Sequence, residues 1–160
     1  MNSFRKRSAP QRGFTLIEAI IVMSIMAILA GVSTSSFVWL NQTTQIRGAA
    51  FDLVADLDFA RSEAVKRNDF VSVAPVGGTW ANGWTVTAGA TVLRQRAALG
   101  GQIAFATAPV AQTFDGAGRP DPTTLGNFQL CPPTPGTLSG RTIRIDASGL
   151  SRSLKTSCAA

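Results

Sequence analysis

The first residue of this sequence that could do chemistry is a lone carboxylate, Glu18, inside an apolar stretch. Between Phe14 and Leu40 it is the only ionisable side chain. An acid near the middle of a membrane-spanning helix costs about 2.5 to 3.5 kcal/mol to insert, and less near one end. One interpretation is that Glu18 reaches the lipid headgroups from the helix end. The alternative is that the carboxylate is kept for a charged partner.

The residues around Glu18 predict a membrane anchor and its orientation. As a helix rising about 1.5 Å per residue, the 14–40 segment is longer than the roughly 20 residues that a bilayer core requires. Basic residues precede it, and no acid does; they are Arg5, Lys6, Arg7 and Arg12. Because positive charge stays cytoplasmic, everything after Leu40 is expected on the far side of the membrane.

The N-terminus resembles that of type IV pilins and type II secretion pseudopilins: a short basic leader, then GFTLIE (residues 13–18) and an apolar helix. This resemblance implies that residues 1–13 are a prepilin leader, removed by a prepilin peptidase between Gly13 and Phe14, and that the Phe14 amine is then methylated. It also implies that Glu18 pairs with the Phe14 amine of a neighbouring subunit during assembly. A pair within one chain, one helical turn apart, is the alternative.

Composition excludes several classes of function. The 160 residues carry a net charge of +6, but the leader holds four of the basic residues, which leaves +2 after cleavage. There is no His, there are two Cys, and we find no Ser-Lys, paired-carboxylate or Gly-rich phosphate motif. The sequence therefore predicts no enzyme, no cofactor and no metal site.

Residues 41–69 predict an amphipathic continuation of the helix. Apolar residues recur at alternating spacings of four and three: Ile46, Ala50, Leu53, Leu57, Ala60 and Ala64, with Ala49, Val54 and Val65 widening the seam. On the other face Glu63 precedes Arg67 by four residues, a favourable pair. We expect the seam to pack on the chain's own sheet; a coiled coil is the alternative.

From residue 70 onward the apolar period changes to two, and Gly and Pro become frequent. The expected strands are FVSVAPV, GWTVTAG, ATVLRQRA, QIAFAT, AQTF, NFQLC, RTIRID and RSLKTSC. The fold class predicted is α+β and pilin-like: a long N-terminal transmembrane and amphipathic helix packed on an all-β head, residues 70–160, of antiparallel sheets.

Within the pilins, the head resembles the GspH/FimT family. The resemblance rests on LDFARSEAVKRN (57–68) as the junction from helix to strand, on WANGW (80–84) as a tryptophan hairpin, and on the Cys-containing C-terminal strands. Trp80 and Trp84 are expected to stabilise the hairpin, and a ligand platform is the alternative.

The two cysteines predict a disulfide. An extracytoplasmic head lies in an oxidising compartment, where two thiols usually pair. A bond between Cys131 and Cys158 would close a loop of about 28 residues and constrain the unfolded chain by roughly 3.5 kcal/mol.

The resemblance implies a structural function. The chain is expected to be a minor pilin or pseudopilin at or near the tip of a type II secretion pseudopilus or type IV pilus, contributing to assembly and secretion. Its expected partners are other pilin or pseudopilin subunits, the inner-membrane assembly platform and prepilin peptidase. The expected location is the inner membrane, crossed once, with the head in the periplasm.

DNA binding during natural transformation is the alternative function, because some FimT-like proteins bind DNA through a C-terminal Gly-Arg-any-Arg motif. This sequence departs from that motif: Gly140 to Arg144 is one residue too long, and Gly149 to Arg152 lacks the first arginine. The candidate DNA-binding residues are Arg141, Arg144, Arg152 and Lys155, which with Asp146 give the last 22 residues a charge of +3. A solvated strand edge protected by its charges explains the same residues without DNA.

Overall fold

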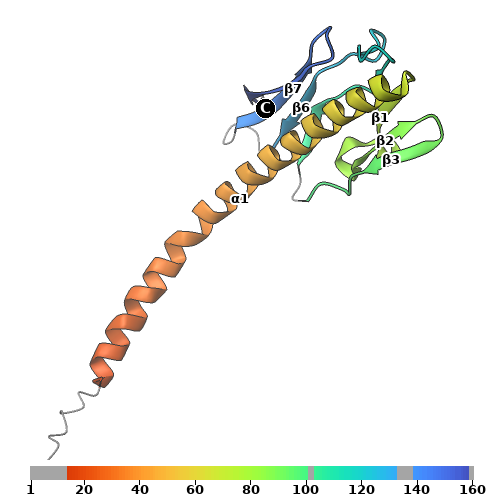
Figure 1. Cartoon of the computed structure of the whole chain (residues 1–160). Helices are drawn as coiled ribbons and strands as arrows, with labels where there is room; N and C mark the ends of the chain where they lie inside the picture. The colour runs from red at the N-terminus through yellow and green to blue at the C-terminus, as the bar shows by residue number, and fades with distance from the viewer. Residues whose placement is uncertain (1–13, 101–102, 133–138, 159–160) are drawn as a thin grey trace, which may run out of the picture. The chain divides into compact units, whose positions relative to one another are not determined.

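The computed structural model describes residues 14–100, 103–132 and 139–158, and within the helix it describes side chains up to residue 31 and from residue 40. The predicted leader, including Gly13, lies outside these residues. The chain divides into two compact units, Met1–Val38 and Trp39–Ala160. One helix, α1 (Leu16–Arg67, 52 residues), contributes to both (Figure 1).

Helix α1 has a defined signal at each end. The Glu18 N–H donates to Oγ1 of Thr15 at 3.3 Å, so Thr15 caps the N-terminus. At the C-terminus Asn68 takes a φ of 52°, and the N–H of Asp69 donates to the carbonyl of Ala64. This left-handed residue and six-to-one hydrogen bond stop the helix where the strands begin.

The predicted seam of α1 faces the core of the head. All six seam residues and Ala49 are buried, and Val54 is half-buried. The predicted pair of Glu63 and Arg67 is present, with Nε to Oε2 at 2.8 Å. The expectation for Val65 is wrong: its side chain is 51% exposed, because the buried stripe is narrower there.

Two four-stranded antiparallel sheets complete the head (Figure 1). The first has the order β3-β2-β1-β5, formed by β1 (Val71–Pro75), β2 (Trp84–Ala88), β3 (Thr91–Gln95) and β5 (Gln112–Phe114). The second has the order β4-β6-β7-β8, formed by β4 (Ala104–Thr107), β6 (Phe128–Cys131), β7 (Ser139–Ile145) and β8 (Ser151–Ser157). Each predicted run contributes one strand, so the predicted α+β class is confirmed.

The WANGW segment lies in the hairpin between β1 and β2, which pair antiparallel with Pro75 opposite Trp84. Two 3-10 turns, Val76–Gly78 and Trp80–Asn82, connect β1 to β2. Both tryptophans are buried: Trp80 packs edge-on against Phe128, with ring centroids 4.8 Å apart, and its Nε1 donates to the carbonyl of Pro109 at 2.8 Å. These contacts give the tryptophans a structural role in the core.

Two turns with the same sequence pattern, Asp-x-x-Gly, bring the sheets together. One contains Asp115 and Gly118 and follows β5; the other contains Asp146 and Gly149 and joins β7 to β8. Both glycines have positive φ, and a Cβ on Gly149 would overlap the carbonyl oxygen of Gly118. Arg61 of α1 donates from Nε to that same carbonyl at 3.1 Å.

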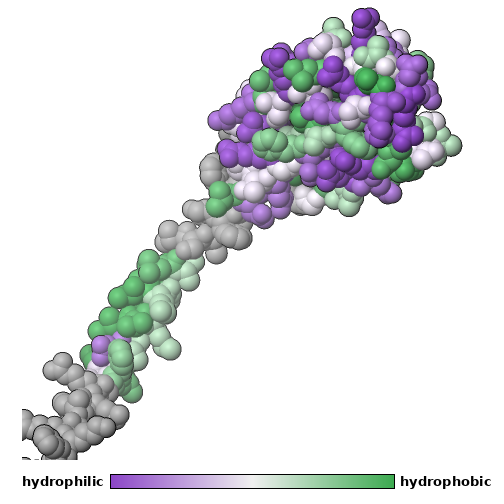
Figure 2. Space-filling model, in the orientation of Figure 1, coloured by the Kyte–Doolittle hydropathy of each residue, from purple (hydrophilic) through white to green (hydrophobic). Residues whose placement is uncertain are grey.

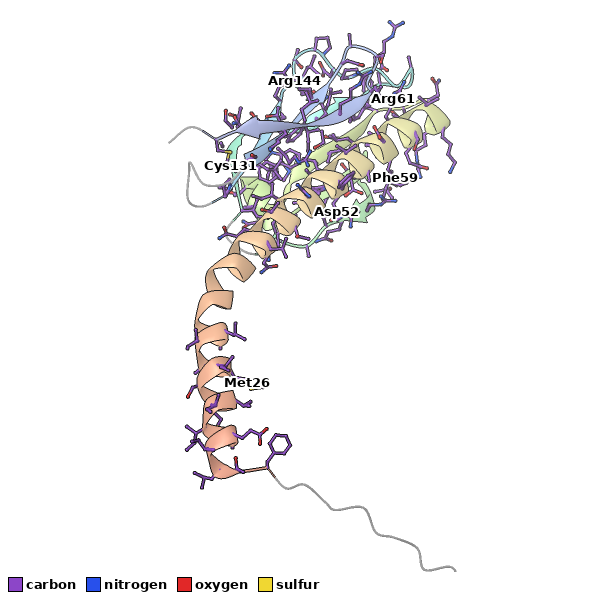
Figure 3. The ribbon with its side chains drawn as sticks, turned by 90° about the vertical axis from the view of Figure 1, so that its left-hand side faces the viewer. Met26, Asp52, Phe59, Arg61, Cys131 and Arg144 are labelled. Carbon is purple, nitrogen blue, oxygen red and sulfur yellow. A yellow bond between two sulfur atoms is a disulfide. The ribbon has the colours of Figure 1, made fainter. Side chains whose placement is uncertain are left out.

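The predicted disulfide between Cys131 and Cys158 is present. Cys131 ends β6 and Cys158 follows β8, so the bond crosses the intervening strand β7 (Figure 3 labels Cys131). The residue beneath it is Gly140, where a Cβ would overlap Sγ of Cys158 and the carbonyl of Leu130. A glycine is therefore required at this point of β7.

Replacing both cysteines by serine should lower the free energy of unfolding by about 3 kcal/mol, because a loop of this length loses its constraint in the unfolded chain. Urea unfolding followed by tryptophan fluorescence measures the change. The native protein under reducing conditions is the control and should fall to the same value. Equal stability of the variant and the oxidised native protein would contradict a structural role.

Candidate functional site

The predicted processing and assembly residues lie at the start of α1. Phe14 is 84% exposed, and Glu18 is also exposed. No hydrogen bond or ion pair joins the Glu18 carboxylate to another described residue, whereas its backbone N–H donates to Oγ1 of Thr15. The chain is uncleaved, and the Phe14 nitrogen is part of its peptide bond to Gly13, so the alternative of a pair between Glu18 and the Phe14 amine of the same chain stays a prediction. The Glu18 carboxylate is exposed at the surface of the helix.

The first part of α1 presents mostly apolar residues on the face seen in Figure 2. Those more than 40% exposed are Leu16, Ile17, Ile20, Ile21, Val22, Met23, Ile25, Met26, Ile28 and Leu29. A single chain buries none of them, so this segment has an apolar surface on every side. Within the part of the chain that the structure describes, no helix meets the length and hydropathy that a membrane crossing requires. The predicted span over residues 14–40 is therefore not confirmed.

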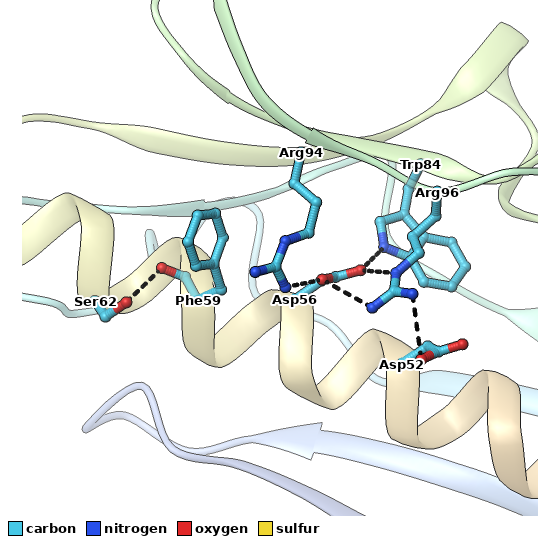
Figure 4. A network of polar contacts seen from close by, with 7 residues as sticks. All are labelled: Asp52, Asp56, Phe59, Ser62, Trp84, Arg94 and Arg96. Atoms are coloured by element: carbon cyan, nitrogen blue, oxygen red, sulfur yellow. Dashed lines mark hydrogen bonds and ion pairs between the residues drawn. The ribbon is translucent and has the colours of Figure 1, made fainter.

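A second charged cluster, which the sequence did not reveal, lies on the part of α1 that belongs to the head (Figure 4). Asp56 is fully buried. Its Oδ2 accepts from Nε1 of Trp84 at 2.9 Å and from Nε of Arg96 at 2.7 Å, while Oδ1 accepts from Nη1 of Arg94 at 2.7 Å. Three donors from β2, from β3 and from the residue just after it therefore converge on one carboxylate of the helix.

The same arginines make further contacts with the helix. The guanidinium carbon of Arg94 lies 4.0 Å from the ring centroid of Phe59, a cation-π contact. Nη1 of Arg96 lies 3.4 Å from Oδ1 of Asp52. Each arginine thus holds α1 at two positions.

Burial alone would raise the pKa of Asp56, but the hydrogen bonds from Arg96, Arg94 and Trp84 outweigh it, and its pKa lies below the ordinary value of 3.8. The hydrogen bond to Asp56 likewise raises the pKa of Arg96. Asp56 is therefore a charged, paired and structural group at neutral pH. Its sequence position three residues after Leu53, within the buried seam, is the signal that could have identified it.

The structure divides the four predicted DNA-binding residues into two pairs. Arg141 lies directly opposite Lys155, and Arg144 directly opposite Arg152, in an uninterrupted antiparallel register. Since successive residues of a strand point to opposite faces, residues 141 and 144 lie on different faces of the sheet. The four cations therefore do not form one continuous patch.

Replacing Asp56 by Asn should lower the free energy of unfolding by about 2–3 kcal/mol, because both arginines lose a charged acceptor while the shape is kept. Urea unfolding at neutral pH measures the change. Asp58→Asn, which removes an exposed acid two residues away on α1, is the matched control and should change little. Equal losses in the two variants would show that the Asp56 carboxylate is not specifically paired.

The lowered pKa of Asp56 should also make the stability of the protein depend on pH. A group whose folded pKa is lowered stabilises the protein above its unfolded pKa, about 3.9, and loses that contribution as the pH falls through the folded value. Native protein should therefore lose more stability than Asp56→Asn when the pH is lowered from 5 towards about 2. The difference between the two curves isolates Asp56 from the other acids. Parallel curves would contradict a lowered pKa.

Comparison with known proteins agrees with these features. Residues 8–34 match the prokaryotic N-terminal methylation motif. No curated protein matches the chain significantly. Two crystal forms of the type IV minor pilin FimU from Pseudomonas aeruginosa have a similar structure. The first is 27% identical over 68% of this chain and 87% of that chain, with a TM-score of 0.59; the second is 28% identical over 68% and 91%, with a TM-score of 0.56.

The match that identifies the family covers most of the head. Residues 49–149 match the family described as type II transport protein GspH, and this range contains the buried half of α1, all of the first sheet and most of the second. The long helix followed by two antiparallel sheets is also the arrangement shared with FimU. The chain therefore belongs to the GspH family of pilin-like proteins.

Proposed function

We propose that this protein is a minor pilin or pseudopilin subunit that enters a filament through the first part of α1, with Glu18 as its electrostatic contact. The observation that carries the proposal is the Glu18 carboxylate, exposed and without a side-chain partner in the described residues. Since GspH proteins are structural pilin-like subunits and not a family of enzymes, assembly is the activity that these residues would serve.

The chemistry of assembly follows from processing. Cleavage between Gly13 and Phe14 by prepilin peptidase would create a cationic amine at the depth of the Glu18 carboxylate. In an apolar environment either charge alone is costly, and each offsets the desolvation of the other. Methylation of Phe14 would keep the positive charge. The pair formed by the amine of one subunit and Glu18 of its neighbour would thus fix the position of one subunit relative to the next along the filament. The apolar side chains would supply the contact area.

The location follows from the same segment. Before assembly, the exposed apolar side chains of α1 would be held in the inner membrane, crossed once, with the head in the periplasm. Its partners there would be other pilin or pseudopilin subunits and the inner-membrane assembly platform. We place the assembled subunit at or near the tip of a type II secretion pseudopilus or type IV pilus; the match to GspH and the likeness to the minor pilin FimU support a minor rather than a major subunit.

DNA binding is not part of the proposal. A protein that follows a phosphate backbone needs its cations along one path, whereas here the four basic residues fall into two pairs on opposite faces.

Replacing Glu18 by Gln should leave membrane insertion unchanged and reduce incorporation into filaments by roughly tenfold, the effect of about 1.4 kcal/mol for an amine left without its charged partner. Immunoblots of purified filaments, compared with the membrane fraction, measure the ratio. Asp58→Asn, which alters an acid on the same helix outside the apolar segment, is the control. Normal incorporation of Glu18→Gln would refute the proposed pairing.

A further inference from the structure

We propose that the free edge of β8, together with Arg144 and Arg152, docks an extended acidic segment of a partner protein, which adds to the second sheet as a fifth strand. This inference goes beyond the assembly role of α1 and rests on the head alone. Its elements, all within the described residues, are a strand edge that no other described strand covers, a pair of like charges with no carboxylate within 4.0 Å, and a hollow lined in part by apolar residues.

The edge of β8 is the one best suited to accept a strand. The second sheet ends at β8, which pairs with β7 over all seven residues, from Ile145 opposite Ser151 to Ser139 opposite Ser157, without a register shift. The outer side of β8 therefore presents a regular row of backbone N–H and C=O groups. Main-chain hydrogen bonding to such a row is how extended peptides add to sheets.

The other sheet edges described by the structure are less suitable. Where β4 pairs with β6, the register shifts between Phe105 and Thr107. Where β3 pairs with β2, the register shifts at Val86 and Thr87 of β2. Strand β5 has only three residues, and Phe114 at its end is bridged by Pro120. A bulge, a short length or charged side chains are the usual means by which a protein prevents edge pairing. Strand β8 has seven residues and no bulge, and its charges, Arg152 and Lys155, repel a basic edge but not an acidic strand.

The charges beside β8 specify an acidic partner. Arg144 and Arg152 lie directly opposite each other, both exposed, and like charges at such positions destabilise a strand pair. Neither has a carboxylate within 4.0 Å among the described side chains, as the ion pairs there involve other arginines and a lysine. Asp146 interacts electrostatically with Arg152, but it is a single acid beside two arginines, and its Oδ1 accepts the backbone N–H groups of Ser148 and Leu150. An external carboxylate would relieve the repulsion.

A hollow of about 510 Å³ lies at this pair of arginines. It is lined by the two arginines, by the polar residues Asn127 and Asp146, and by the apolar residues Ile145, Leu150 and Leu154. Leu150, just before β8, is 39% exposed, and Leu154 is 47% exposed although every other residue of β8 is polar or charged. A strand with alternating acidic and apolar residues presents both kinds of group at this spacing.

The same observations favour a polypeptide over a nucleic acid. No aromatic side chain lines the hollow, so there is no surface on which a base would stack. The second cationic pair, Arg141 and Lys155, lies on the opposite face and cannot extend a phosphate path. An unpaired strand edge, in contrast, supplies groups that only another backbone satisfies.

The test uses the full chain in neutral detergent and a short synthetic peptide of alternating glutamate with valine or threonine, labelled for fluorescence anisotropy. The native protein should bind this peptide, and Arg144→Gln with Arg152→Gln should weaken binding by about tenfold, as expected for two exposed charge contacts. The matched control, Arg141→Gln with Lys155→Gln, removes the same charge from the opposite face and should leave affinity within about twofold.

Two further probes separate the elements of the proposal. A peptide of the same charge with proline at its central positions should bind at least about tenfold more weakly, because proline cannot donate to a strand edge. Equal binding of the two peptides would overturn strand addition, and equal loss in both double variants would overturn the assignment to Arg144 and Arg152. Failure of the native protein to bind the acidic peptide, or binding of a DNA oligonucleotide in its place, would overturn the proposal as a whole.

Discussion

A buried carboxylate must have all its donors in position at once, and this constraint on Asp56 fixes the first sheet to α1. Two arginines and one indole satisfy it, and the absence of any one would leave charge or a polar group buried without a partner. Burial of the apolar seam alone would tolerate small sliding and rotation of the helix, because hydrophobic contact is not directional. Hydrogen bonds to Asp56, with Arg94 over Phe59 and Arg96 beside Asp52, remove that freedom.

The second sheet is held by different means. Its C-terminal strand joins β6 through the Cys131–Cys158 bond, which passes over Gly140 of β7, and its other end is fixed where two Asp-x-x-Gly turns meet. Arg61, one turn of α1 beyond the Asp56 cluster, donates to the turn that follows β5. Successive turns of one helix therefore position both sheets, which is why a head with so many short strands can present defined edges.

Much of this fold is predictable from the sequence because it depends on periodicity. The seam of α1 and the eight strands follow from apolar spacing, and the disulfide follows from two cysteines in an oxidising compartment. Asp56 is missed because an apolar pattern gives no weight to a buried acid whose partners are about 30 to 40 residues away. The hairpin at WANGW is predictable, but the contacts of its tryptophans are not, because Trp80 packs on Phe128 and donates to Pro109 while Trp84 donates to Asp56, and all three are distant in sequence.

The basic residues of β7 and β8 show how much the alternation of side chains along a strand decides about a binding surface. A period of two already places Arg141 and Arg144 on opposite faces, so charge counted along the sequence overstates any single patch. Which residues oppose them depends on the turn at Asp146 and Gly149, since one residue more or less would exchange the faces of β8. The observed register concentrates Arg144, Arg152 and Leu154 beside a free edge. The repulsion between these arginines disfavours pairing with another copy of the same edge, and it is relieved by an acidic strand, so a single arrangement would prevent self-association and select a partner.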